Sequence, residues 1–130
     1  MQDKKGYEFT ARDITDWILL HRHGNAFFRY PEWRILYDIQ NAITSKTIVV
    51  SVDEHGQLHG VILGYWYKDS NTFHVANVLS DGPNRFHAMA EKLMTLYPTC
   101  KVMAQRRGKL VTYKNIDELI RKAGGLSATC

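Results

Sequence analysis

The pattern of apolar and polar residues is most regular between residues 47 and 79, where two short polar turns separate three apolar runs. The runs read TIVVSVD, LHGVILGYWYK and TFHVANVL, and the turns between them read EHGQ and DSN. Runs rich in β-branched and aromatic residues, bounded by turn residues such as Gly56 and Asn71, are typical of strands joined as hairpins. The pattern therefore predicts three strands, over residues 47–53, 58–67 and 72–79, that pair antiparallel in sequence order.

The middle run is apolar on both faces between Val61 and Tyr67, which predicts a strand covered by helices on both sides. Gly60 and Gly64 interrupt this run. A glycine inside a strand marks a β-bulge, a close approach by a ligand or another backbone, or a plain packing constraint. The sequence leaves these three alternatives open.

Residues on either side of the three strands follow the spacing of amphipathic helices. We expect a short strand at residues 7–9, followed by a helix that Thr10 caps and Gly24 ends. A second helix should begin at Pro31 and run to about Thr44. Further elements are predicted after the three strands: a helix over 84–96, strands over 100–104 and 109–113, and a helix between Asn115 and Gly124. The strand from residue 100 follows a helical crossover, so we expect it to lie parallel to its neighbour.

Composition favours a single domain. The chain has 130 residues, 45% of them hydrophobic, which is enough for one core over residues 1–130 with a frayed tail at 125–130. No run of about 18 apolar residues is present, and the start MQDKKGYEFT lacks the apolar segment of a secretion signal. We therefore expect a cytoplasmic protein without a membrane partner. The two cysteines and six histidines show no spacing typical of a disulfide scaffold or a zinc site, so we expect no metal.

The chain carries a formal net charge of +4 and has a pI near 9.1. Part of this charge is concentrated in residues 101–114, which include Arg106, Arg107 and Lys109. Such a cluster can bind the phosphates of a cofactor or of a nucleic acid. A solvated hairpin turn explains it equally well.

The order of strand, two helices, three meandering strands, helix and strand resembles that of the GNAT superfamily, the Gcn5-related N-acetyltransferases. The resemblance covers roughly residues 7–104. YEFTARDITDW is similar to the family's opening strand and helix, and TIVVSVDEHGQLHGVILGYW to its second and third strands. The resemblance implies an α/β (α+β) fold with a mixed, mostly antiparallel sheet flanked by helices. It also implies transfer of an acyl group from a thioester donor, such as acyl-CoA, to an amine.

In that family an acyl-CoA signature, Q/R-x-x-G-x-G/A, follows the fourth strand, where this chain has SDGPNR at residues 80–85. The loop has one glycine where two are expected, a proline that removes an N–H donor, and an aspartate that repels phosphate. The resemblance implies that the phosphates of a donor would lie near five residues: Gly82, Asn84, Arg85, Arg106 and Arg107.

A divergent branch with the same fold, the toxin-activating lysine acyltransferases, also lacks the glycine signature and uses an acyl-carrier-protein donor. Its catalysis rests on a histidine early in the chain and an aspartate after the fourth strand. His21 or His23 and Asp81 stand at similar positions here. The later segment LYP…VMAQRRGKLV is similar to the closing pattern of that branch.

Acyl transfer to an amine needs a base, backbone donors for the oxyanion, and an acid for the leaving thiolate. His74, on the strand pattern at residues 72–79, is the first candidate for the base, and Asp81 is its competitor. Tyr113 is the candidate acid, as a late tyrosine is in many enzymes of this family. Each has a structural alternative: a half-buried strand histidine, a turn or cap aspartate, and a packed strand tyrosine.

Two classes of function stay open. The first is a divergent N-acyltransferase acting on an amine or a protein substrate. The second is a catalytically inactive domain of the same fold, of a kind expected from a virus, a phage or an accessory system. Such a module would bind protein or nucleic acid through the basic cluster and the aromatic run Tyr65-Trp66-Tyr67, in the host cytoplasm or the virion.

Overall fold

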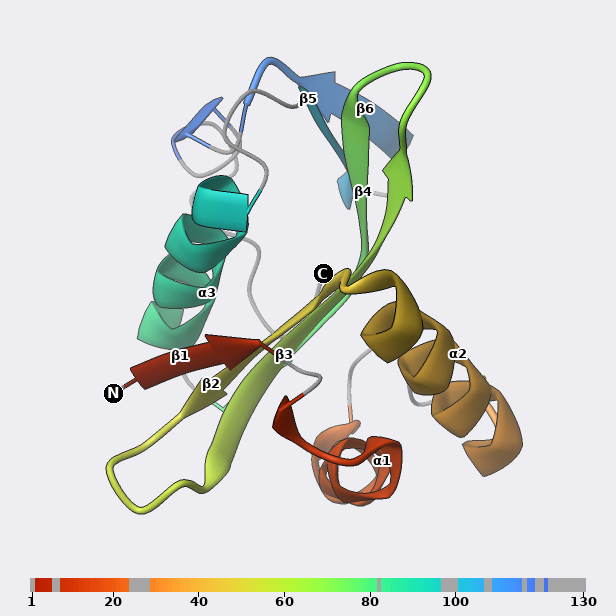
Figure 1. The fold of residues 1–130 in the computed structure, drawn as a ribbon, viewed down its shortest axis with the longest axis vertical. Coiled ribbons are helices and arrows are strands. Elements are labelled where there is room, and N and C mark those ends of the chain that lie inside the picture. Colours follow the sequence, from red (N-terminus) through yellow and green to blue (C-terminus); the bar gives the residue numbers. More distant parts are fainter. Residues whose placement is uncertain are drawn as a thin grey trace.

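The computed structural model describes residues 2–5, 8–23, 29–81, 83–96, 101–106, 109–115, 117–118 and 121. Its elements in chain order are β1 (Gln2–Lys5), α1 (Ala11–His21), α2 (Glu32–Ser45), β2 (Ile48–Val52), β3 (Leu58–Tyr67), β4 (Thr72–Ser80), α3 (Pro83–Leu96), β5 (Lys101–Arg106) and β6 (Lys109–Tyr113). The six strands form one sheet in the order of the chain (Figure 1). Neighbouring strands are antiparallel except β4 and β5, which are parallel because α3 carries the chain back across the sheet.

This arrangement confirms the predicted α/β fold with a mixed, mostly antiparallel sheet flanked by helices. The strands β2, β3 and β4 form the expected antiparallel meander. Residues 84–96 are helical within α3, and the strand that follows it lies parallel to β4. None of the helices in the described parts of the chain is both long and apolar enough to cross a membrane.

Helices cover both faces of the sheet, with α1 and α2 on one face and α3 on the other (Figure 1). The alternation along β2 divides its side chains between two cores. Val50 joins the core under α1 and α2, whereas Val49 joins the core under α3. Ile39 of α2 and Met89 of α3 are fully buried, one in each core. The sheet is therefore stabilised by burial on both sides.

The prediction that β3 is buried on both faces as far as Tyr67 is wrong beyond Gly64. Residues 61–64 are buried, but Tyr65 and Tyr67 are 46% and 44% exposed. Trp66, between them, packs against the core under α3. Burial alternates here because this end of β3 is covered on the α3 face and open on the other.

A β-bulge in β4 lies opposite Gly64. Leu63 pairs with Asn77, and Gly64 pairs with Val75, so Ala76 is the extra residue. Of the alternatives that the sequence left open for this glycine, the structure shows a bulge on the facing strand. The bulge moves the second half of β4 by one residue relative to β3.

A second bulge lies in β3 itself. Ser51 pairs with Gly60, and Val52 pairs with Leu58, so His59 is the extra residue. At a bulge the side chain can take a direction that regular pairing would not allow. His59 belongs to the candidate site described below.

The first strand lies earlier than predicted. β1 pairs with β2, with Lys5 opposite Val49, whereas Glu8 and Phe9 form a short turn ahead of α1. Phe9 packs against the core under α1 and α2, so its apolar side chain is partly buried without strand pairing. Thr10 caps α1 as predicted, because its Oγ1 accepts a hydrogen bond from the backbone N–H of Asp13 at 3.1 Å.

The second helix begins one residue later than predicted. Pro31 is its N-cap, with an extended ψ of 154°, and the helix ends before Lys46, which adopts a left-handed φ of 59°. The predicted cap of the last helix is present, since Asn115 Oδ1 accepts from Glu118 N at 2.9 Å. The predicted helix ends at Gly24 and Gly124, and the tail at 125–130, lie outside the described residues.

Candidate functional site

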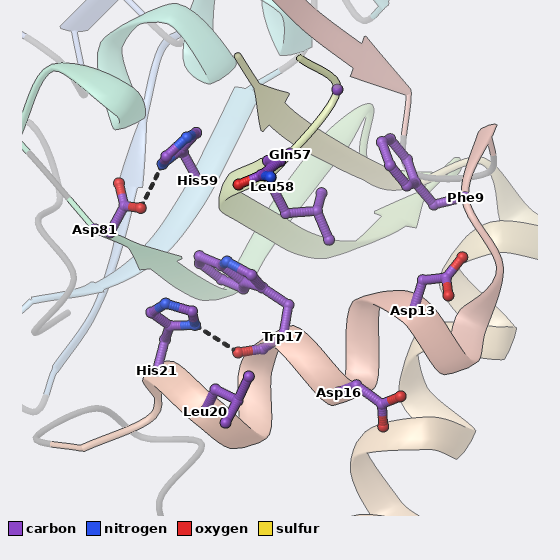
Figure 2. Close-up of a pocket in the computed structure, with 11 residues that line it drawn as sticks. Phe9, Asp13, Asp16, Trp17, Leu20, His21, Gln57, Leu58, His59 and Asp81 are labelled. Atoms are coloured by element: carbon purple, nitrogen blue, oxygen red, sulfur yellow. Dashed lines mark hydrogen bonds and ion pairs between the residues drawn. The ribbon is translucent and has the colours of Figure 1, made fainter.

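A pocket of about 510 Å³ opens where the end of β4 meets α1 and the β2–β3 turn (Figure 2). Three of its lining side chains carry chemistry: His21, His59 and Asp81. Apolar side chains from α1, the segment before it and β3 contribute to the wall: Phe9, Trp17, Leu20 and Leu58. Asp13, Asp16, Gly56 and Gln57 complete the lining. We call this the Asp81 pocket.

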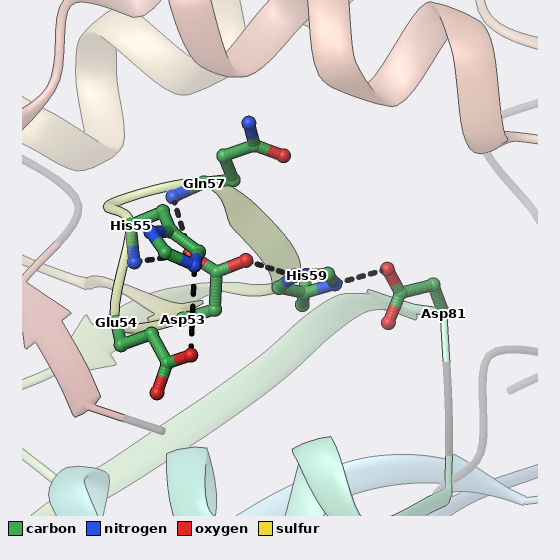
Figure 3. Close-up of polar contacts among 6 residues, drawn as sticks. All are labelled: Asp53, Glu54, His55, Gln57, His59 and Asp81. Carbon is green, nitrogen blue, oxygen red and sulfur yellow. Dashed lines mark hydrogen bonds and ion pairs between the residues drawn. The ribbon is translucent and has the colours of Figure 1, made fainter.

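His59 lies between two carboxylates (Figure 3). Its Nδ1 is 2.5 Å from Asp81 Oδ2, and its Nε2 is 2.9 Å from Asp53 Oδ2. Ionised carboxylates only accept hydrogen bonds, so both ring nitrogens act as donors, which is the imidazolium form of histidine. The three side chains therefore form one charged, hydrogen-bonded series from the β2–β3 turn to the end of β4.

The turn between β2 and β3 holds Asp53, which is one end of this series, in place. Asp53 Oδ1 accepts from the backbone N–H groups of His55, at 2.8 Å, and Gln57, at 3.0 Å. The hydrogen bond from His59, followed by that from Gln57, lowers the pKa of Asp53 from 3.8 to about 2. The Asp53 carboxylate is therefore ionised at neutral and mildly acidic pH and keeps its hold on His59.

His21 is the last residue of α1. Its Nδ1 lies 2.8 Å from the backbone oxygen of Trp17, and its ring stacks on that of Trp17 with centroids 4.4 Å apart. A carbonyl oxygen only accepts, so Nδ1 carries a proton, and in the neutral ring Nε2 then holds a free lone pair. A fixed tautomer and ring plane suit a general base.

These groups give the Asp81 pocket a defined chemical capacity. His21 can accept a proton, Asp81 can attract a cation, and the apolar wall can cover a hydrocarbon chain. Across the described ranges of the chain, no three His, Cys, Asp or Glu side chains are grouped as metal ligands would be.

His74 lines a second cavity, of about 390 Å³, near the point where the β4–β5 ladder ends at Val75 and Ala104. Burial lowers the pKa of His74 below its usual 6.5, so its ring is neutral at pH 7. Its Nδ1 is buried and has no hydrogen-bond partner among the described residues. We call this the His74 cavity, and its other lining residues are Tyr30, Arg34, Asp38, Tyr65, Ala76, Asn77 and Leu110.

The structure separates the three residues that the sequence singled out for catalysis. Asp81 lies in the Asp81 pocket, and His74 lies in the His74 cavity. Tyr113 is 3% exposed within the core under α3. It pairs with Val102 of that core, whereas the partner of His74 is Met103, so Tyr113 and His74 are on opposite faces of the sheet. The structure brings Asp81 together with His21, and His23 is not among the residues lining that pocket.

The residues expected to hold a donor's phosphates are described only in part. Asn84 and Arg85 lie in the first turn of α3, and Arg106 is the last residue of β5. Gly82 and Arg107 lie outside the described residues.

Sequence reasoning did not single out His59 as a site residue. The available signal was the register of the β3–β4 hairpin, where Tyr67 pairs with Thr72. Counting outward from that pair places Ser80 opposite His59. The bulge at Ala76 brings Asp81 opposite His59 instead, and no turn residue in the sequence indicated this bulge.

No protein-family model matches the sequence, and a search of curated proteins gave no significant match. The structural evidence on function is therefore the Asp81 pocket, the His74 cavity and the fold that positions them.

Proposed function

We propose that this chain is a divergent N-acyltransferase that moves an acyl group from a thioester to an amine in the Asp81 pocket. The observation that carries this proposal is the convergence of His21, from the end of α1, and Asp81, from the end of β4, on one pocket. The resemblance to the toxin-activating lysine acyltransferases implies the same two residue types at these places in the chain.

The topology supports the proposal. The antiparallel meander from β2 to β4, the crossover through α3 and the parallel strand β5 are the order that the GNAT resemblance implies. The β4–β5 ladder joins residues 72–75 to 101–104, and β4 continues beyond it to Ser80, next to Asp81. The proposed reaction centre thus lies at the end of β4 where the chain enters α3.

The chemistry follows from the roles that these groups can take. The acceptor's ammonium group first loses one proton to solvent. The resulting amine then gives a second proton to His21 Nε2 as its nitrogen attacks the carbonyl carbon of the thioester to form the new C–N bond. Collapse of the tetrahedral intermediate breaks the C–S bond, and the leaving thiolate takes the proton from His21. Before these steps, Asp81 attracts the ammonium group of the acceptor. His59, which is itself held by Asp53, keeps the Asp81 carboxylate in place.

The donor is a thioester whose acyl chain lies against the apolar wall of the pocket. Asp13 and Asp16 also line the pocket, so phosphates would be repelled from its interior. In an acyl-CoA complex the phosphates would lie at the start of α3, near Asn84 and Arg85, where backbone N–H groups have no partner within the helix.

The test is acyl transfer from octanoyl-CoA and, in a second arm, from an octanoylated carrier protein to a lysine-rich peptide. Mass spectrometry detects the acylated peptide, and thiol release gives the rate. We expect His21→Gln and Asp81→Asn each to lower the rate roughly 10²- to 10⁴-fold. His23→Gln and Asp69→Asn make the same chemical changes at exposed positions that do not line the pocket, so they should leave the rate unchanged.

The variant His74→Gln tests whether the reaction takes place in the Asp81 pocket or in the His74 cavity. If it abolishes transfer while His21→Gln does not, the reaction takes place in the His74 cavity and the assignment to the Asp81 pocket is wrong. Absence of peptide acylation with both donors would refute the enzyme proposal itself.

Exposed aromatic side chains favour a second candidate function, a catalytically inactive module that binds protein or nucleic acid. Trp33 and Tyr37 are one turn apart on α2 and are 70% and 58% exposed. Exposed rings can stack on bases or pack into a partner's pocket. Fluorescence anisotropy with a labelled single-stranded oligonucleotide tests the nucleic-acid form, which predicts weaker binding for Trp33→Ala and in raised salt.

A further inference from the structure

The His74 cavity is a separate site from the Asp81 pocket, because the two share no lining residue. We propose that this cavity binds a small organic cation that carries N–H donors, an ammonium or a guanidinium, with Asp38 as its anionic partner. The proposal does not depend on acyl transfer in the Asp81 pocket.

The first observation is the state of Asp38, on α2. Its side chain is only 15% exposed, yet its one ion pair among the described residues is with Arg34 Nε at 3.8 Å, too long for a hydrogen bond. Burial raises the pKa of Asp38 above 3.8, and the opposite charge of Arg34 offsets this effect only in part. A largely buried carboxylate without an N–H donor is costly, and a ligand that supplies donors removes that cost.

Arg34 does not fill this role, because its guanidinium is engaged elsewhere. It lies over the ring of Tyr30, with its central carbon 4.4 Å from the ring centroid, and its side chain is 52% exposed. In this proposal, Oδ1 of Asp38 accepts from the ligand while the ion pair between Oδ2 and Arg34 persists.

The aromatic lining of the cavity also suits a cation. Tyr65 supplies a ring whose face can attract a cation, whereas one face of the Tyr30 ring is already covered by Arg34. Tyr65 lies close enough to Asp38 for the carboxylate to contribute to the raised pKa of the phenol, after burial. The neighbouring imidazole of His74, with ring centroids 6.0 Å apart, is neutral at pH 7 and adds no repelling charge. Asn77 adds an amide that can accept a hydrogen bond.

The volume of about 390 Å³ limits the ligand to a small molecule or one side chain. Two sources of the same chemistry fit, a primary ammonium and a guanidinium, and n-butylammonium and n-butylguanidinium serve as probes for them. Two further probes separate the contribution of the N–H donors from that of the positive charge. Tetramethylammonium is a cation without N–H donors, and 1-butanol is a neutral molecule of similar size.

Binding is measured by titrating the full chain with each probe and following its ¹H–¹⁵N spectrum. We expect saturable shifts around Asp38, Tyr65 and Asn77 with n-butylammonium or n-butylguanidinium, weaker binding of tetramethylammonium, and none of 1-butanol. Asp38→Asn should weaken binding of the cations at least tenfold. Asp69→Asn removes the same charge from an exposed turn and should leave binding unchanged.

Several outcomes would overturn the proposal: no saturable shift with either N–H cation, equal binding of tetramethylammonium or 1-butanol, or equal affinity for the wild type and Asp38→Asn. The comparison of probes on the wild type holds even if Asp38→Asn does not fold. None of these measurements involves acyl transfer, so failure here and failure of the enzyme proposal are distinguishable.

Discussion

His59 and Asp81 are joined twice, once through the backbone and once through their side chains. The N–H of Asp81 donates to the oxygen of His59 at 3.0 Å, and Nδ1 of His59 donates to Asp81 Oδ2 at 2.5 Å. Because Asp53 accepts from the other ring nitrogen, the β2–β3 turn also determines where the Asp81 carboxylate lies. A substitution in that turn can therefore alter a site formed at the end of β4.

If the chain is the proposed acyltransferase, replacing His59 should impair acyl transfer without removing a group that reacts. In His59→Gln, one amide nitrogen cannot donate to carboxylates on both sides, so Asp81 loses its fixed position. We expect kcat to fall roughly 10- to 100-fold, with a smaller change in KM for the acceptor. His55→Gln is the control, because His55 lies in the same turn with a side chain that is 76% exposed. Equal rates for the two variants would show that His59 does not position Asp81.

The lowered pKa of Asp53 predicts a pH dependence of stability. The folded form binds the proton less readily than the unfolded chain, whose aspartates titrate near 3.8, so the contribution is complete above that pH. It is lost as the pH falls from about 4 towards about 2. The free energy of unfolding of the wild type should therefore fall more steeply over this range than that of Asp53→Asn. Parallel curves for the two proteins would contradict the assignment.

The close packing at Gly64 predicts a large loss of stability on adding one methyl group. A Cβ there would lie 2.3 Å from a ring carbon of Phe73 and 2.6 Å from the backbone oxygen of His74. We expect Gly64→Ala to cost about 3 kcal/mol or more in urea unfolding. Gly56→Ala meets no atom within 4 Å and is disfavoured only by its φ of +77°, which should cost about 1 kcal/mol. Similar losses for both would mean that Gly64 is not closely packed.

The two cores predict that large-to-small substitutions are costly on both faces of the sheet. Ile39 and Met89 are fully buried beneath α2 and α3 respectively. Replacing either by alanine should lower the free energy of unfolding by about 2 to 5 kcal/mol. Leu20, 75% exposed, provides the control, and Leu20→Ala should change stability by less than about 0.5 kcal/mol. A small effect at either buried position would show that its face of the sheet contributes little.

The fold could be predicted from the sequence because its signals are local. Two short polar turns left only antiparallel hairpins for β2, β3 and β4, and the apolar spacing of residues 84–96 indicated the crossover helix. The end of β3 was predicted less well, since an apolar run does not reveal where a covering helix stops. Tyr65 and Tyr67 are exposed for that reason.

The site could be predicted only in part. The first candidate for the base was His74, and His21 or His23 entered with Asp81 only through the family resemblance. The charged series through His59 depends on two bulges, and bulges leave no reliable pattern in a single sequence. Asp38 has the spacing of an ordinary surface residue on an amphipathic helix. Its burial arises from tertiary contact with the sheet, which local periodicity does not encode.

The bulge at Ala76 links the length of β4 to its pairing with β3. With the bulge, Asp81 comes opposite His59, whereas regular pairing over the same length would bring Ser80 there instead. A chain with one residue fewer in this stretch and no bulge would again bring the aspartate opposite the histidine. Among homologous chains, loss of one residue between the turn at residues 68–71 and Asp81 should therefore accompany loss of the bulge, whereas the length of the turn itself can vary freely.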